Sequence, residues 1–476
     1  MIIRAFISTY TNENKYKNRK NDSNMNYKQT EEYVLNIPKF RAEGSIEETR
    51  KFYEFLGKPG QSASIVHVAG TNGKGSTCAY MNSVLTEAGY KVGMFTSPHL
   101  VSVRERMRVN NSQIAEREFV ACFQQLTNQI DKYNNYSPTF YEFLFFMAML
   151  YFEKQKADII ILETGMGGRL DATNVIDAPK VAVITEIGKD HMEILGDTYE
   201  LIAQEKAGII KKGSVVVYSG NRQEVAEVIE RKAGELGVLC KCVEKLENQD
   251  YSFVYKKIDF SFYSRYYGYI PIKLNTCAIY QVENAKLALT AIEELGVEVS
   301  KEAIQRGMEI CKWEGRMEEI LPGIFLDGAH NEDGIDAFVS SVKGDGCKGH
   351  RWLLFSAVVD KEYILMKDRL IESDLFEYIY ATPLKTTRSI RREELEIIFA
   401  DAEIAERSKL ETISDTKDEC ISAKNKLENI VTDYKVRILD SAYEGFQEIL
   451  SLKKEEDYVY VTGSLYLVGE IKERKL

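Results

Sequence analysis

Apolar strands that alternate with helices constrain this fold more than any other feature of the sequence. The alternation begins at "IVHVAG", which a glycine-rich turn joins to a helix with Met81, Val84, Leu85 and Ala88 on one face. Further apolar runs follow at "KVGMFTS", "DIIILETG", "KVAVITEIG" and "GSVVVYSG", with the helical "TFYEFLFFMAMLYFEKQKA" among them. Runs that are apolar throughout are typical of parallel strands buried on both faces. The sequence therefore predicts an α/β fold with a doubly wound, mostly parallel sheet.

Length and a second alternation indicate two α/β domains. A chain of 476 residues is longer than one core usually serves. Residues 244–277 are rich in Tyr, Phe and Lys with alternating polarity, which suggests a small antiparallel sheet. From about Gly315, strands are expected at "GIFLDG", "RWLLFSAVV", "YIYAT" and "YVYVTG". We therefore expect an N-terminal P-loop domain over 29–314 and a C-terminal Rossmann-like domain over 315–476.

Composition argues against several classes of protein. The net charge of −11, from 62 basic and 73 acidic residues, argues against a nucleic-acid partner, and no run of about 18 apolar residues predicts a membrane span. The eight scattered cysteines indicate reduced thiols in a cytoplasm, although Cys240 and Cys242 could be a strand face or a metal site. Residues 1–28 are expected to be a disordered leader, with Met25 an alternative start, and the charged stretch 408–429 a solvated helix surface.

The stretch "VAGTNGKGST", from Val68 to Thr77, predicts an anion site. Glycines let backbone N–H groups converge on an anion, and the N-terminus of the following helix adds its dipole. The pattern departs from the Walker motif, because Val68 takes the first glycine position and Gly75 separates Lys74 from Ser76. A structural strand-to-helix turn is the alternative, but the pattern favours a nucleotide phosphate.

Three more polar residues follow predicted strands or end a predicted helix. Glu163 ends "IIILE", and His191 follows "VAVITEIGK" and Asp190, at the edge where ligands bind in open α/β sheets. An acidic group near a phosphate site suits Mg²⁺. Taken singly, each residue has a simpler explanation: Glu163 as a solvated strand end, His191 as a structural histidine, and Lys206 of "EKAGII" as a surface lysine.

Seven sequence blocks together resemble the folylpolyglutamate synthase/dihydrofolate synthase family of the Mur ligase superfamily. The blocks are "HVAGTNGKGST", "FTSPHL", "LETGMGGRLDATN", "DHMEILGDTYELIAQEKAGII", "EGRME", "LDGAHN" and "VTGSLY", in the family's order from about Ile37 to the C-terminus. The resemblance implies an ATP-dependent amide ligase, with a Mur ligase central-type domain over 29–314 and a glutamate-ligase-type domain over 315–476. A carboxylate of the pterin substrate would take the γ-phosphate of ATP, because oxide is a poor leaving group, and the amine of L-glutamate would then attack.

The resemblance also implies which residues hold ATP and two Mg²⁺ ions. Those expected to bind the nucleotide are Thr71, Asn72, Gly73, Lys74, Gly75, Ser76, Asn284, Arg316, Asp327 and His330. The expected metal ligands are Ser97, Glu163, His191 and Lys206. Lys206 matches a lysine that relatives carry as an N6-carboxylate, which would turn a cation that repels Mg²⁺ into an oxygen ligand. The expected catalytic residues are Lys74, His191 and Lys206. ATP would then bridge the two domains.

The block "GGRLDATN" matches one that lines the dihydropteroate pocket of bifunctional members. This match implies that the acceptor contacts Leu170, Asp171, Ala172 and Thr173. The chain departs from the family pattern in "KFRAEGSIEE" and in lacking Gly-x-His before Gln281. We therefore expect a bifunctional enzyme that adds glutamate to reduced folates and to 7,8-dihydropteroate, and the two departures bear on the second of these acceptors.

The expected protein is a bifunctional, cytoplasmic and monomeric enzyme that acts on small-molecule substrates. Three other functions remain as alternatives. One is a folylpolyglutamate synthase with a single activity. Another is a Mur-type ligase for a cell-wall precursor, but the 69 residues before Gly70 are few for the additional domain of such enzymes. A non-catalytic nucleotide-binding protein is the third, and the presence of Glu163, His191, Lys206 and Asp327 argues against it.

Overall fold

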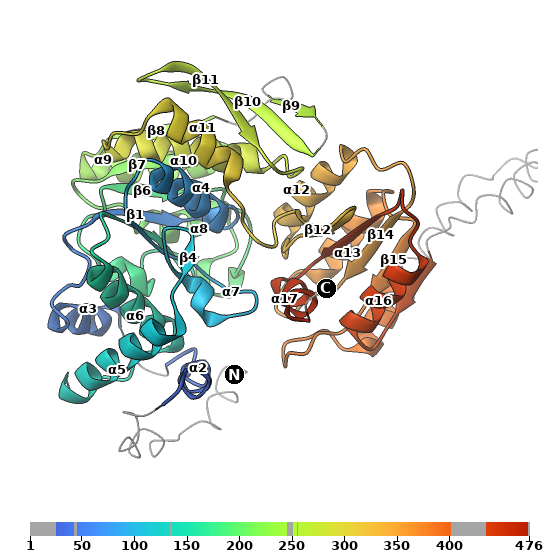
Figure 1. The fold of residues 1–476 in the computed structure, drawn as a ribbon, viewed down its shortest axis with the longest axis horizontal. Coiled ribbons are helices and arrows are strands. Elements are labelled where there is room, and N and C mark those ends of the chain that lie inside the picture. The colour runs from blue at the N-terminus through green and yellow to red at the C-terminus, as the bar shows by residue number, and fades with distance from the viewer. Residues whose placement is uncertain are drawn as a thin grey trace, which may run out of the picture.

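Two large sheets form two lobes of the molecule (Figure 1). The computed structural model of the 476-residue chain describes residues 25–41, 45–133, 136–244, 251–254, 256–400 and 435–474. The expected helix surface at 408–429 lies outside these described residues.

The first sheet has eight strands. In spatial order they are β4 (Ser112–Gln113), β3 (Met107–Val109), β2 (Val92–Phe95), β5 (Ile159–Glu163), β1 (Ser64–Ala69), β6 (Val181–Ile184), β7 (Val215–Ser219) and β8 (Cys240–Val243). All pairs from β2 to β8 are parallel, so the predicted doubly wound sheet is confirmed. The antiparallel edge β3–β4 is not predicted, because its strands have only three and two residues.

Helices cover both faces of this sheet, because successive strand residues point to opposite sides. Val66 and Val68 of β1 pack in one cluster with α4 (Lys74–Glu87), α10 (Gln281–Leu295) and α11 (Lys301–Ile310). The opposite face is covered by α6 (Phe140–Gln155), α8 (Tyr199–Ala207) and α9 (Gln223–Leu236). The alternation therefore buries β1 on both sides and leaves its C-terminal end for a site.

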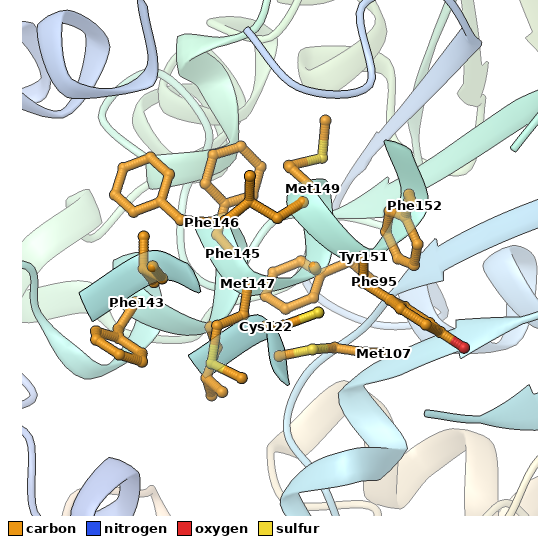
Figure 2. Packing of buried hydrophobic residues seen from close by; sticks show 14 of the residues in the cluster. Phe95, Met107, Cys122, Phe143, Phe145, Phe146, Met147, Met149, Tyr151 and Phe152 are labelled. Carbon is orange, nitrogen blue, oxygen red and sulfur yellow. The ribbon is translucent and has the colours of Figure 1, made fainter. Parts of the chain in front are cut away.

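Helix α6 is apolar on nearly all sides, which suits a helix that is buried between layers. Thr139 starts it as N-cap, in a capping box with Glu142. Its aromatic and Met side chains interleave with Phe95, Met107 and Cys122 (Figure 2). Each fully buried Phe contributes roughly 2–3 kcal/mol to folding. This packing holds the sheet that carries the candidate site. Helices α5 (Glu116–Tyr133) and α3 (Ile46–Phe55) contribute side chains to the same cluster.

Helix α2 (Tyr27–Leu35) begins inside the segment expected to be disordered, so the prediction of a leader over 1–28 is wrong for residues 25–28. Asn26 caps the helix through its side-chain oxygen, which accepts from Gln29 N at 3.1 Å, and the Gln29 side chain accepts from Asn26 N at 3.0 Å. This reciprocal capping satisfies two backbone donors that a free helix end would leave unpaired. Residues 1–24 lie outside the described residues.

A three-stranded antiparallel sheet connects to the first lobe, as the alternating polarity of this region predicts. It consists of β9 (Tyr251–Val254), β10 (Lys257–Ser264) and β11 (Gly268–Leu274). Its apolar side chains Phe260, Ile270 and Ile272 join the core that contains α10 and α11, and Figure 1 shows it above these helices.

The second large sheet has six strands. In spatial order they are β12 (Glu318–Leu321), β13 (Ile324–Leu326), β17 (Tyr458–Thr462), β14 (Arg351–Phe355), β15 (Tyr378–Ala381) and β16 (Lys435–Ile438). All pairs except β12–β13 are parallel. Helices α12 (Glu332–Lys343) and α13 (Tyr363–Glu372) cover one face, and α16 (Ala442–Leu452) and α17 (Leu465–Glu473) cover the other. No helix in the described part of the chain is long and apolar enough to cross a membrane.

Candidate active site

The glycine loop between β1 and α4 has a shape that only glycine allows at two positions. Gly70 and Gly73 have φ angles of +156° and +84°. A Cβ at Gly70 would lie 1.8 Å from Thr185 Oγ1, and one at Gly73 would lie 2.2 Å from Asn284 Oδ1. The loop is also held by Thr71, whose hydroxyl donates to Gly188 O at 3.0 Å. The positive φ angles and these close contacts therefore set the shape of the loop.

Backbone donors at the start of α4 have no helical acceptor. The first bond of the helix runs from Thr77 N to Gly73 O, so the four N–H groups of residues 73–76 have no partner within the helix. Such groups form an anion site together with the helix dipole. This geometry supports the predicted phosphate site over a purely structural turn.

Two lysines lie against the carbonyls of this loop. Lys74 Nζ donates to Gly70 O and Thr71 O at 3.0 and 3.1 Å, and Lys206 Nζ donates to the same Gly70 O at 2.7 Å. Neither forms an ion pair with any described carboxylate. Burial, together with the charge of Lys74, lowers the pKa of Lys206 to about 7. The loop therefore carries positive charge that an anion or a modification would compensate.

Glu163 lies at the C-terminal end of β5 and is 3% exposed. One of its oxygens accepts from Ser97 N at 3.0 Å. Burial raises the pKa of Glu163, against the effect of Lys74, which favours the charged form. The carboxylate of Glu163 accepts from the backbone of Ser97, and a carboxylate together with a serine hydroxyl is a donor set that suits Mg²⁺. Among the described residues no three His, Cys, Asp or Glu side chains form a metal cluster.

His191 and His330 approach the same carboxylate from the two lobes. Nε2 of each lies 3.9 Å from Asp190 Oδ2, and Lys361 Nζ lies 2.5 Å from Asp190 Oδ1. Burial lowers the pKa of His191, and lowers that of His330 to about 4. Both imidazoles are therefore neutral at pH 7, which is the form that binds metal ions.

Asp327 directly follows β13. Its carboxylate accepts from Tyr280 Oη at 2.6 Å, Met317 N at 2.9 Å and Ala329 N at 2.8 Å. The charge of Arg316 lowers the pKa of Asp327 against the larger effect of burial, which raises it. The Asp327 carboxylate is thus held in place by hydrogen bonds from Tyr280 and from two backbone N–H groups.

Contacts across the two lobes meet at the glycine loop. Asn72 and Asn331 exchange a reciprocal pair of amide hydrogen bonds of 3.1 and 3.2 Å. Arg222 pairs with Asp333 at 2.7 Å. Each such hydrogen bond stabilises by about 1 kcal/mol. A ligand on the glycine loop would therefore touch the second lobe as well.

Asn284 and Ser76 lie in one short hydrogen-bonded series. Asn284 Nδ2 donates to Gln281 Oε1 at 3.0 Å, and Gln281 Nε2 donates to Ser76 Oγ at 3.2 Å. Of the predicted nucleotide residues, Thr71, Asn72, Gly73, Lys74, Gly75 and Ser76 form the glycine loop and the start of α4, and Asn284 lies against Gly73. Arg316, Asp327 and His330 belong to the second lobe. Their roles toward ATP remain predictions.

Three of the four residues expected to contact the acceptor point inward. Leu170 is 60% exposed, whereas Asp171, Ala172 and Thr173 are buried. Asp171 accepts from the backbone N–H groups of Gly165, Met166 and Thr173 at 2.8, 3.0 and 3.0 Å. Asp171 and Thr173 therefore shape this loop from inside, and only Leu170 presents its side chain to solvent.

Several residues at the site have no signal in the sequence. Lys361 and Tyr280 reach it only because the fold brings distant segments together. Arg106 is buried and its side chain donates to His99 Nδ1 at 2.8 Å, so it is a third cation, after Lys74 and Lys206, without a described carboxylate partner. His67 is the exception: a histidine inside the apolar run "IVHVAG" is a local signal of a special role.

Comparisons with known proteins assign the chain to a family. The Mur ligase middle domain family matches residues 68–292. The dihydrofolate synthase/folylpolyglutamate synthase of Bacillus subtilis is 33% identical over 462 residues, which cover 94% of this chain and 99% of that protein. This chain belongs to the folylpolyglutamate synthase/dihydrofolate synthase family of Mur ligases.

Other relatives agree with this assignment. The folylpolyglutamate synthase of Lacticaseibacillus casei is 30% identical over 76% of this chain and 86% of that protein. The solved structure of Escherichia coli FolC in complex with DHPP and ADP is similar with a TM-score of 0.76 at 27% identity, over 94% of this chain and 97% of that one. The predicted family, fold class and carbon–nitrogen ligase activity of this family are thereby confirmed. The predicted domain ranges and residue roles stay predictions.

Proposed function

We propose that this protein joins L-glutamate to tetrahydrofolate and its polyglutamates, and also to 7,8-dihydropteroate, using ATP. The observation that supports this proposal most is the pair of lysines on Gly70 O, which have no carboxylate partner among the described residues, beside the buried Glu163. The B. subtilis relative carries both synthase activities in its name, and E. coli FolC holds DHPP and ADP. These names support the second acceptor, dihydropteroate.

The chemistry requires transfer of the γ-phosphoryl group to a carboxylate. One carboxylate oxygen of the acceptor bonds to the γ-phosphorus as the bond to ADP breaks, which gives an acyl phosphate. The amine of L-glutamate then attacks the acyl carbon, loses a proton, and phosphate leaves. Lys74 and the N–H groups of residues 73–76 would neutralise charge that moves onto the β- and γ-oxygens.

Magnesium would bind where carboxylate and hydroxyl oxygens meet the phosphates. Ser97 and Glu163 would hold the first ion, and Glu163, His191 and the modified Lys206 would hold the second. Mg²⁺ supplies charge neutralisation on the phosphoryl oxygens and fixes their orientation. The neutral state of His191 and the poor solvation of Glu163 both fit this role.

Closure of the two lobes would protect the acyl phosphate from water. Asn331, Asp333 and Lys361 of the second lobe already contact the first lobe around the glycine loop. ATP on this loop, with its ribose at Asp327, would therefore lie between the lobes. Exclusion of water matters because hydrolysis of the intermediate would waste ATP. We propose a monomer in the cytoplasm as its working state.

Lys206 is expected to carry CO₂ as a carbamate in the working enzyme. Its amine is buried, bonds only to the Gly70 carbonyl, and has no described acidic partner. With a pKa of about 7, much of the amine is uncharged at neutral pH and can attack CO₂ with loss of a proton. In ¹³C-bicarbonate, the wild type should show one carbamate carbon signal in NMR spectra that Lys206→Ala lacks.

The exposed neighbour Lys212 supplies the control for this experiment. Lys212→Ala should keep both the carbamate signal and ligase activity, whereas Lys206→Ala should lower kcat/KM by about 100-fold. Full activity of Lys206→Ala, or the same carbamate signal in all three proteins, would contradict the modification.

An ADP-release assay with separate omissions tests the proposed function. ADP should form only when L-glutamate and either tetrahydrofolate or dihydropteroate are both present. Turnover with tetrahydrofolate alone as acceptor would favour a folylpolyglutamate synthase with a single activity. ATP binding without turnover on either acceptor would refute the proposal and favour a non-catalytic nucleotide-binding protein.

A further inference from the structure

His67 lies in the middle of β1, three residues before Gly70, and is fully buried. The proposed reaction does not use it. Its Nε2 lies 2.8 Å from Thr173 Oγ1, and Thr173 Oγ1 lies 2.5 Å from Asp171 Oδ1. A polar series of three side chains therefore links the strand before the glycine loop to the loop of residues 165–174.

The direction of these hydrogen bonds follows from the partners of Asp171. Both of its oxygens accept from backbone N–H groups, so the carboxylate is an acceptor throughout. Thr173 must then donate its single hydroxyl proton to Asp171 and accept from His67. The imidazole of His67 is consequently protonated at Nε2 and carries a lone pair at Nδ1.

Nδ1 of His67 is a buried atom without a hydrogen-bond partner in the described structure. Burial, with a smaller effect of Lys211, lowers the pKa of His67 to about 3, so the ring stays neutral. An unpaired buried polar atom costs about 1–3 kcal/mol. A leucine or valine would fill a strand position without this cost. A role in positioning other residues therefore explains the imidazole at this position better than packing does.

The loop of residues 165–174 is held at its other side by contacts that do not involve His67. Arg169 N donates to Glu205 O at 2.7 Å, and Asn174 Nδ2 donates to Gly208 O at 3.1 Å. The series from His67 instead fixes Asp171 and, through it, the N–H groups of Gly165 and Met166. The exposed Leu170 lies between these two sets of contacts.

We propose that His67 is a positioning residue for the pterin acceptor, acting through Thr173 and Asp171 on the loop that presents Leu170. It would touch neither ATP nor acceptor. This inference rests on the proposed ligase function and on the prediction that the loop borders the acceptor. Loss of the series should loosen the first half of the loop and leave the ATP site intact.

Two substitutions break the series without a large change of shape. Thr173→Val removes only the hydroxyl, and His67→Leu removes the donor together with the unpaired Nδ1. Both should raise KM for tetrahydrofolate and for dihydropteroate by about 10-fold, with KM for ATP within twofold and melting temperatures within a few degrees of the wild type. His67→Gln offers an amide donor near the place of Nε2 and should restore most of the acceptor affinity.

Thr127→Val is a matched control, because Thr127 is also buried but its hydroxyl donates to carbonyls of its own helix, including Phe123 O at 3.0 Å. It should leave every KM unchanged. Unchanged acceptor KM values in Thr173→Val, or equal increases for ATP and acceptor, would overturn the inference.

A spectroscopic readout separates failure of this inference from failure of the proposed function. ¹⁵N spectra of the wild type should show His67 as the Nε2–H tautomer, and hydrogen exchange should be faster at Gly165 and Met166 in Thr173→Val. Absence of ligation in the wild type would refute the function alone, since these signals test the hydrogen-bond series directly. An Nδ1–H tautomer, or unchanged exchange, would refute the series itself.

Discussion

Lys74→Met is expected to lower ATP-dependent ligation by about 10²–10³-fold, with little effect on the fold. The side chain donates hydrogen bonds to Gly70 O and Thr71 O and forms no ion pair with a described carboxylate, so its charge is available to phosphate oxygens. Methionine keeps the aliphatic stem and removes the charge. The loss should appear mainly in kcat, because charge on the transferred phosphoryl group is redistributed at the transition state. Single-turnover ADP formation and a thermal melt measure the two effects.

Lys312→Met is the control for this prediction, because Lys312 is exposed. It should leave kcat and the melting temperature unchanged. If Lys74→Met kept more than a tenth of wild-type kcat, the glycine loop would not be the phosphoryl-transfer site. A selective rise in KM for ATP, with kcat unchanged, would also contradict the account.

Glu163→Gln is expected to lower kcat/KM by at least about 100-fold and yet to stabilise the ligand-free protein. Glutamine fits the same space and can still accept from Ser97 N, but it is a weaker Mg²⁺ ligand than a carboxylate. Burial raises the pKa of Glu163 above its unfolded value, so the charged form opposes folding once the pH exceeds the unfolded pKa. Removing the charge should therefore raise the melting temperature at pH 7, and this gain should shrink as the pH falls toward 4.

Glu142→Gln supplies the contrasting variant for the stability measurement. Glu142 is also buried, but it pairs with Arg41 at 2.5 Å and accepts from Thr49 Oγ1 at 2.6 Å. Neutralising it takes the nearest carboxylate from a partly buried cation and leaves Arg41 with the longer pair to Glu48 at 3.8 Å, so the melting temperature should fall. If Glu163→Gln lowered the melting temperature as Glu142→Gln does, Glu163 would be a structural residue and not a metal ligand.

Local patterns in the sequence predict most of the first sheet and the glycine loop. Buried parallel strands need apolar residues on both faces, and the loop needs glycine where φ is positive, so both leave short-range signals. The edge strands β3 and β4 do not, because they are too short to show alternation. Asn26 shows the opposite failure: its capping box is local, but it lies in a polar segment that composition alone marks as disordered.

Interactions between distant residues explain what the sequence could not predict about the site. The pairs Asn72–Asn331 and Asp190–Lys361 join residues more than 150 positions apart, so no local pattern records them. The "GGRLDATN" block predicts a loop near the acceptor but not which side chains face inward. Only the structure shows that the Asp171 carboxylate accepts hydrogen bonds from backbone N–H groups.

Oxygen tracing tests the central claim most directly. The account requires that one oxygen of the acceptor carboxylate leaves with phosphate, because it becomes the bridging oxygen of the acyl phosphate. With dihydropteroate labelled with ¹⁸O in both carboxylate oxygens, together with ATP and L-glutamate, each phosphate released should carry one ¹⁸O and the new amide should retain the other. Phosphate without ¹⁸O, formed together with the amide product, would contradict phosphoryl transfer to the acceptor.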